Sequence, residues 1–202
     1  MANIIVKNGV VAYQMTSDMK LTDNALITRG FIDPTTTTEN AKVVENVFIP
    51  NRFQPGMFSY DEETRLIKPL DDALPYLLEQ YKTEKLSELN AACDEALAAL
   101  TASYPAMETL TFDKQETEAR AFNVDDPESG KFVRTLAAAR GIDASTLAAK
   151  IIVKSDAFAQ ASGYLIGLRQ KYEDQLDAAQ TIGDIESIVF DFSFPSEEEP
   201  ET

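Results

Sequence analysis

The sequence contains no histidine and a single cysteine, and these shortages remove much familiar catalytic and metal chemistry. Histidine is the commonest general base near neutral pH and the commonest zinc ligand, so Ser–His–Asp, Cys–His and histidine-based metal sites are excluded. One cysteine can form neither an intrachain disulfide nor a thiolate cluster. Cys93 lies at helical spacing between Leu89 and Leu97, beside the acidic Asp94 and Glu95. We therefore expect a small buried side chain and not a reactive thiolate.

Long hydrophobic runs are also missing from this chain. The longest strongly apolar stretch in its helical half, residues 164–168, is far shorter than the roughly 20 residues that cross a bilayer. The N-terminus leads straight into an apolar segment, without the basic region, long apolar region and cleavage site of a secretory signal. We expect no transmembrane segment and a cytosolic location.

Positive charge is scarce: 34 acidic residues face 18 basic ones, for a net charge of −16. Residues 1–70 hold 8 acidic and 7 basic residues, whereas residues 71–202 hold 26 acidic and 11 basic. Nucleic acids and anionic membrane surfaces attract proteins chiefly through Lys and Arg, so we expect neither as a partner. The asymmetry between the halves favours a protein that interacts with other proteins.

The first 70 residues contain short apolar segments separated by turn residues, a pattern typical of a small antiparallel sheet. Asn8-Gly9 separates two β-branched runs, which is a strong signal for a hairpin with a type I′ turn. Further strands are expected at residues 25–28, 43–49, 57–60 and 64–67, with turn residues between them.

From residue 70 the apolar period changes to that of helices. An apolar stripe predicts a helix over residues 74–101, and shorter helices are expected at 113–122 and 132–140. A long helix at 144–179 would follow, with Gly141 past the preceding helix end and Asp143 or Ser145 as its N-cap. Ile151, Phe158, Leu165 and Tyr172 repeat every seven residues and predict one buried seam. The two long helices should pair antiparallel.

The C-terminal residues alternate again, with Phe190, Phe192 and Phe194 on one side of a predicted strand and an acidic tail behind it. We expect residues 196–202 to be disordered in isolation. The sequence thus predicts an α+β protein: a small antiparallel β domain at 1–70, an antiparallel α-helical bundle or hairpin at 71–188, and a strand-like acidic tail at 189–202.

No motif in the chain amounts to an enzymatic or cofactor site. Asp125, Asp126 and Glu128 cluster in one loop without the ligand spacing of a calcium loop, which favours a solvated turn. The segment at 129–131 lacks the upstream glycine of a phosphate-binding loop. We therefore predict no enzyme activity, no cofactor and no metal. A carboxylate-dependent glycosidase is a remote alternative.

The helical half resembles a module found toward the C-terminus of many small tailed-phage and prophage tail proteins, including tail-fibre assembly proteins. The likeness covers about residues 80–180, in order and with similar spacing, and is carried by the segments at 111–121, 136–142, 147–159 and 162–170. Residues 1–70 are similar to these proteins only in layout, with a Pro-aromatic-Tyr-Asp stretch at 55–61 ahead of the helices.

The resemblance implies a protein that acts on the tail-fibre apparatus or is built into it. One hypothesis is an assembly chaperone in the host cytoplasm, whose β domain caps strand edges of a fibre. The alternative is a permanent virion component, such as a small baseplate or fibre-linking subunit, whose 190–194 strand locks into a neighbour; self-association stays open. Aromatic residues of the β domain are expected mostly in its core, but they are also candidates for a contact patch. The predicted partner-binding residues are Phe53, Met57, Phe58, Tyr60, Phe190, Phe192 and Phe194.

Overall fold

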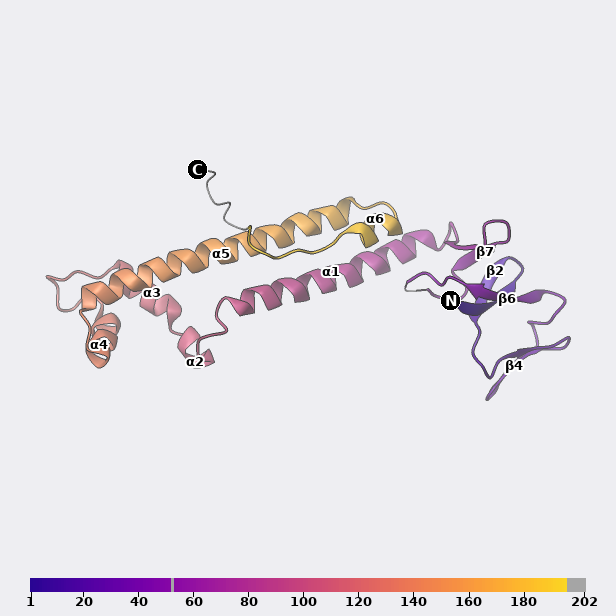
Figure 1. The fold of residues 1–202 in the computed structure, drawn as a ribbon, viewed down its shortest axis with the longest axis horizontal. Coiled ribbons are helices and arrows are strands. Elements are labelled where there is room, and N and C mark those ends of the chain that lie inside the picture. The colour runs from indigo at the N-terminus through magenta and orange to yellow at the C-terminus, as the bar shows by residue number, and fades with distance from the viewer. Residues whose placement is uncertain (52, 196–202) are drawn as a thin grey trace, which may run out of the picture. The chain divides into compact units, whose positions relative to one another are not determined.

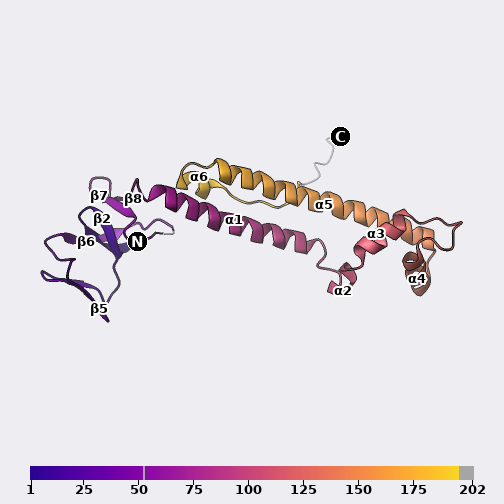
Figure 2. The same ribbon diagram turned by 180° about the vertical axis from the view of Figure 1, so that it is seen from behind.

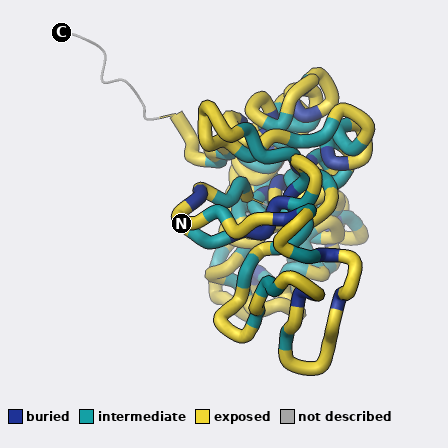
Figure 3. Tube along the Cα trace, turned by 90° about the vertical axis from the view of Figure 1, so that its right-hand side faces the viewer, coloured by how far each residue is buried: buried dark blue, intermediate teal, exposed yellow. Residues whose placement is uncertain are grey.

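The computed structural model describes residues 1–51 and 53–195, and in them antiparallel sheets precede a series of helices (Figure 1). The predicted α+β class is confirmed. The chain divides into two compact units, Met1–Tyr81 and Lys82–Thr202, and the boundary falls within α1 (Leu74–Ala99). All the strands in the described part of the chain belong to the first unit. Figure 2 shows the same ribbon from behind, and Figure 3 maps burial along the chain.

The larger sheet of the first unit has the strand order β6-β1-β2-β7-β8, and every neighbouring pair is antiparallel. β1 (Ala2–Lys7) and β2 (Val10–Gln14) form the predicted hairpin. Asn8 and Gly9 between them both have positive φ, 51° and 81°, as a type I′ turn requires. The other strands are β6 (Ala41–Val47), β7 (Phe58–Asp61) and β8 (Leu66–Pro69).

A second sheet of three short strands was only partly predicted. It consists of β3 (Lys20–Leu21), β4 (Leu26–Thr28) and β5 (Phe31–Asp33), in that order. Strands of two and three residues between turns are too short to show an alternating pattern, so the sequence revealed β4 alone. One face of this sheet packs against the larger sheet in a core built on Ile5, Leu26 and Ala41, with Tyr13, Met19 and Leu21 around it.

The start of α1 belongs to the first unit. Leu77 and Tyr81 are buried there, one helical turn apart, together with Ile4, Val11 and Phe58 of the sheet. The Tyr81 hydroxyl donates a hydrogen bond to the carbonyl of Asn51. The side chains of α1 that follow Tyr81 belong to the second unit.

In the second unit, α1 runs antiparallel to α5 (Ala144–Ala178), as the sequence predicted (Figures 1 and 2). Lys82 Nζ donates to the carbonyl of Asp177 at 2.8 Å, and Arg169 Nη1 donates to Asn90 Oδ1 at 3.2 Å. Asn90 lies eight residues after Lys82 on α1, and Arg169 lies eight residues before Asp177 on α5, so both bonds report one antiparallel register. The apolar stripe of α1 faces α5, and Leu89 and Cys93 in it are buried, as predicted.

The N-terminal part of α5 packs against two short helices, α3 (Phe112–Arg120) and α4 (Lys131–Arg140). Their shared core consists of Ala119, Val133, Ala137, Leu147 and Ala148. Gly141 ends α4 in the left-handed conformation, with φ 65°, and the Asp143 side chain caps α5 by accepting from the Thr146 N–H. Both features were predicted. A single-turn helix, α2 (Ala106–Thr109), was not.

One member of the predicted seam on α5 is misplaced. Leu165 is buried, and Ile151 and Tyr172 are partly buried, but Phe158 is 45 % exposed. It lies two residues after Asp156, which pairs with Arg120 at the end of α3, and the flanking positions from 156 to 160 are exposed as well. A continuous heptad pattern therefore overestimates how continuously the helix is covered.

The predicted strand at 190–194 is wrong. After α5, a short helix α6 (Ile182–Ser187) begins with a capping box formed by Thr181 and Asp184. Residues 188–195, here called the C-terminal strap, then form neither helix nor strand. The strap packs on helices, and so it has no neighbouring strand with which to form a ladder. The acidic tail at 196–202 lies outside the described residues.

Candidate partner-binding surfaces

The four predicted contact residues of the β domain lie in and around the core of the first unit. Phe58 is only 1 % exposed, and its ring lies 5.2 Å from that of Phe53, centroid to centroid. Phe53, Met57 and Tyr60 are partly buried. Phe58 is the one buried residue of β7, whose other residues are only partly buried. Assigning Phe58 to a contact patch was therefore incorrect: its side chain belongs to the core.

Exposed apolar side chains gather instead on the second sheet. Ile27 of β4 and Ile32 of β5 are directly paired across the strands, and they are 40 % and 63 % exposed. Lys20 of β3 is the partner of Ile27 on the other side. Directly opposed residues lie on the same face of a sheet, so Lys20, Ile27 and Ile32 form one outward row. We call this row the isoleucine face. Phe31 of β5 is also exposed, but it precedes Ile32 and pairs with Thr28, so it belongs to the other face of the sheet.

The opposite face of the same sheet is held by a buried carboxylate. Asp33 Oδ2 accepts hydrogen bonds from the hydroxyls of Tyr13 (3.0 Å) and Thr36 (2.5 Å), and its Oδ1 accepts from the N–H (2.9 Å) and hydroxyl (2.6 Å) of Thr35. These donors, the Thr35 and Thr36 hydroxyls foremost, hold the pKa of Asp33 well below its ordinary value. The side chain is thus fully occupied in fixing β5 and its following turn to β2. It is a structural carboxylate.

The threonine run at 35–38 is held by hydrogen bonds in the same way. Thr36 is fully buried, the Thr37 N–H donates to Asn40 Oδ1, and the Thr38 hydroxyl donates to Asp23 Oδ1. The second sheet is therefore fixed from one side, and its isoleucine face is a defined surface on the other.

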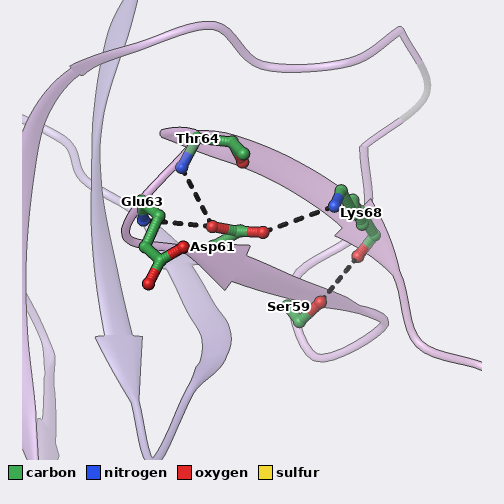
Figure 4. A network of polar contacts seen from close by, with 5 residues as sticks. All are labelled: Ser59, Asp61, Glu63, Thr64 and Lys68. Carbon is green, nitrogen blue, oxygen red and sulfur yellow. Dashed lines mark hydrogen bonds and ion pairs between the residues drawn. The ribbon is translucent and has the colours of Figure 1, made fainter.

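A second carboxylate network closes the β7–β8 hairpin (Figure 4). Asp61 Oδ1 accepts from the N–H groups of Glu63 and Thr64, both at 3.0 Å, and Lys68 Nζ reaches Oδ2 at 3.3 Å. The Ser59 hydroxyl donates to the carbonyl of Lys68 across the same pair of strands. The pKa of Asp61 is lowered, chiefly by the Thr64 N–H. These bonds serve the turn itself.

The hairpin also reaches the far edge of its own sheet. Arg65 Nη2 donates to the carbonyl of Glu45 on β6 at 3.0 Å, and Lys42 of β6 forms an ion pair with Glu62 of the hairpin loop. β6 and β8 are the two edge strands of this five-stranded sheet. These contacts therefore join the edge strand β6 to the β7–β8 hairpin at the other edge. Such ties shield an edge from pairing with other chains. The second sheet has no comparable tie across its isoleucine face among the described residues.

The three predicted phenylalanines of the C-terminal strap point toward the helices of their own unit. Phe190 and Phe192 lie 5.4 and 6.0 Å from the Tyr172 ring, and Phe194 stacks on Tyr164 at 5.5 Å. Lys85 Nζ lies 4.7 Å from the Phe190 ring centroid. Because these rings are engaged within the chain, they anchor the strap. Phe194 nevertheless remains 49 % exposed, and Val189 is exposed as well.

The acidic loop between α3 and α4 is an ordinary structured turn. Asp126 Oδ1 accepts from the Glu128 N–H at 2.9 Å, and Arg134 donates to the carbonyls of Asn123, Asp126 and Ser129. Within residues 1–51 and 53–195, no group of three or more Cys, Asp or Glu side chains is placed to hold a metal ion. No helix in the described part of the chain is long and apolar enough to cross a membrane.

Comparison with known proteins gives one partial match. A family model described as the HI1402 helical domain matches residues 153–189. This segment comprises most of α5, all of α6 and the first residues of the strap, and it is 37 of the 202 residues. Neither the curated proteins nor the solved structures contain a match to the chain. The similarity therefore applies to the end of the second unit only.

Proposed function

We propose that this protein is a phage tail-fibre-associated protein, acting in the host cytoplasm as an assembly chaperone that binds the fibre through protein–protein contacts. The resemblance of the helical half to tail proteins supports the context. The observation that carries the binding role is the isoleucine face, an exposed apolar row on a sheet whose outer strands, β3 and β5, are both edges.

The chemistry of such a face suits the capping of a β-rich partner. An unpaired strand edge on a fibre subunit presents free N–H and C=O groups beside apolar side chains, and it aggregates until it is covered. A short edge strand such as β5, with Ile32 exposed on the isoleucine face, can offer backbone partners and apolar contact together. The fixed network around Asp33 holds β5 in place, so little ordering entropy is lost on binding.

The test is co-expression with the fibre gene encoded beside this one. We expect soluble fibre trimer only when both chains are made, and a strongly reduced yield with the double variant Ile27→Ser/Ile32→Ser. Leu66→Ser is the matched control, because Leu66 is an exposed apolar residue of the same unit on β8. A fibre yield that does not depend on this chain contradicts the proposal.

The alternative role, a permanent baseplate or fibre-linking subunit, is distinguished with purified phage particles. A chaperone is released or substoichiometric in mature virions, whereas a structural subunit is present at fixed stoichiometry with the fibre. The strap is the feature that favours this alternative, since an anchored extended segment can lock into a neighbouring subunit.

A further inference from the structure

The C-terminal strap is an extended segment attached to its unit by one side only. Phe190, Phe192 and Phe194 alternate along it, and all three rings contact tyrosines of α5, whereas Val189 between Ile188 and Phe190 is exposed. This two-residue period is the side-chain geometry of a β-strand. The strap therefore has the shape of a strand without having a strand beside it.

One edge of the strap is satisfied by tyrosine hydroxyls. The Asp191 N–H donates to the Tyr172 hydroxyl at 3.1 Å, and that hydroxyl donates to the Asp191 carbonyl at 3.3 Å. The Tyr164 hydroxyl donates to the Ser193 carbonyl at 3.4 Å, and the Ser193 N–H donates to Asp191 Oδ1 at 2.9 Å. Both backbone groups of residues 191 and 193 are thus occupied.

The other edge of the strap is open. In an extended chain the backbone groups of successive residues point to opposite edges, so those of Phe190, Phe192 and Phe194 face away from the edge that Asp191 and Ser193 present. Among the described residues no hydrogen bond is made by the backbone N–H or C=O of these three phenylalanines. Three residues at two-residue spacing offer the donor and acceptor pattern of one side of a ladder.

The charge around the strap selects the kind of strand that can pair with it. No Lys or Arg follows Lys171 in the sequence, whereas ten acidic residues do. Three of them, Asp184, Glu186 and Asp191, are exposed on α6 and the strap. Of the basic residues nearby, Lys85 is engaged with the Phe190 ring and with Glu88 at 3.5 Å, and Arg169 is paired with Glu173 at 2.9 Å. A strand that carries Lys or Arg complements this surface, and an acidic strand is repelled.

We propose that the open edge of the C-terminal strap binds an extended, basic segment of a partner polypeptide by β-strand addition. This inference deepens the proposed function and rests on it, because both require a polypeptide partner. It concerns a second surface, which lies on the acidic second unit. The strap is already anchored by its aromatic rings, so the partner's backbone meets a preformed edge. The acidic side chains then select for basic sequence.

The experiment uses the full chain and a synthetic peptide of alternating lysine and valine, and it does not require the fibre. We expect binding in isothermal titration calorimetry that weakens as salt is added. In amide hydrogen exchange followed by NMR, the N–H groups of Phe190, Phe192 and Phe194 should become protected, and those of Asp191 and Ser193 should change little. Binding without protection of these three amides overturns the proposal.

Two matched variants distinguish the contribution of the strap's backbone edge to peptide binding from that of the aromatic rings. Phe192→Pro removes both the ring and the N–H, whereas Phe192→Ala removes the ring alone; the proline variant should bind the peptide about tenfold more weakly than the alanine variant. Equal binding by the two variants overturns the role of the edge. The corresponding glutamate–valine peptide should bind about tenfold more weakly than the lysine peptide, and equal affinity overturns the charge selection.

The outcomes also separate this inference from the proposed function. If fibre yield is independent of the chain but the peptide protects the strap amides, the strap site stands and the chaperone role fails. If the fibre depends on the chain but the lysine peptide neither binds nor protects, the strap site fails and the isoleucine face remains the contact surface.

Discussion

The two units differ in how many acidic residues they hold and in where most of those residues lie. The first unit, residues 1–81, holds 11 acidic and 7 basic residues. Three of its aspartates, Asp18, Asp33 and Asp61, accept hydrogen bonds from nearby turn residues, and these bonds lower their pKa. The second unit, residues 82–202, holds 23 acidic and 11 basic residues, many of them on open helix faces. In the first unit these carboxylates hold turns of the sheets. In the second unit Asp143 and Asp184 cap helices, but many other acidic residues lie on exposed helix faces, and the packing of the helices depends on apolar stripes.

This difference indicates by which interactions each surface can bind a partner. A surface whose polar groups are already paired, as around Asp33, is recognised through its apolar side chains. A surface with exposed acidic side chains and an open backbone edge, as along the strap, is recognised through charge and hydrogen bonds. The isoleucine face and the strap edge are therefore different kinds of surface, and the experiments above address them separately.

The largest effect is expected from Phe58→Ala, which should destabilise the first unit by about 3–5 kcal/mol because it empties a fully buried site. Thermal unfolding followed by near-ultraviolet circular dichroism measures the loss. Leu66→Ala on the neighbouring strand is the control, since Leu66 is exposed and should change stability little. If both substitutions cost the same, Phe58 is not a core residue and the contact role first predicted for it returns.

In the second unit, the comparison is made between two adjacent residues of α5. Leu165→Ala should cost about 2–5 kcal/mol, because this side chain is only 1 % exposed. Ile166→Ala, at 42 % exposure, should cost far less. Urea unfolding followed by helical circular dichroism measures both.

The reactivity of Cys93 gives an independent measure of how readily α1 and α5 separate. Its thiol is buried, and burial is the main cause that raises its pKa, so a thiol reagent should modify it only when α1 and α5 separate. Leu165→Ala should therefore accelerate labelling of Cys93 and Ile166→Ala should not. Rapid labelling of the unmodified protein would show that the pair opens readily.

A smaller and pH-dependent effect is expected from Asp33→Asn in the first unit. The folded pKa of Asp33 lies below its unfolded value of about 3.9, so its stabilisation is present above that pH and is lost as the pH falls through the folded pKa. The variant should be less stable than the parent near neutral pH, and the two should converge in acid. Unfolding curves at a series of pH values test this, and a constant difference down to strongly acidic pH would contradict it.

Much of the helical unit could be predicted because its signals are local. The spacing of Leu86, Leu89 and Cys93, the cap at Asp143 and the glycine at 141 each act within a few residues, and the structure confirms them. Phe158 was misplaced because a heptad pattern indicates which side faces a partner, but it does not indicate how far the partner extends.

The candidate surfaces were harder to predict because they depend on distant partners. Phe58 and Ile32 are both large apolar residues on strands, and the packing of the sheet face to which each points decides that the first is buried and the second exposed. The alternation of phenylalanines in the strap was recognised, but tyrosines about 20 residues earlier in the chain replaced the expected strand partner. A two-residue period predicts an extended chain, but it does not indicate which element the extended chain packs against.

The smallest effect is expected from the polar contacts between α1 and α5. Arg169 donates to Asn90 on α1 and to Glu173 one turn along α5, at 3.2 and 2.9 Å, and its side chain is partly exposed. Arg169→Gln should cost about 0.5–1 kcal/mol more than Lys171→Gln, since both remove one positive charge from the same helix and only Arg169 bridges the two helices. Urea unfolding at low and high salt measures the difference, which should shrink as salt screens the Glu173 pair. A loss as large as that of Leu165→Ala would assign the stability of the helix pair to its polar contacts, and the second unit would then resemble the first in how it uses charge.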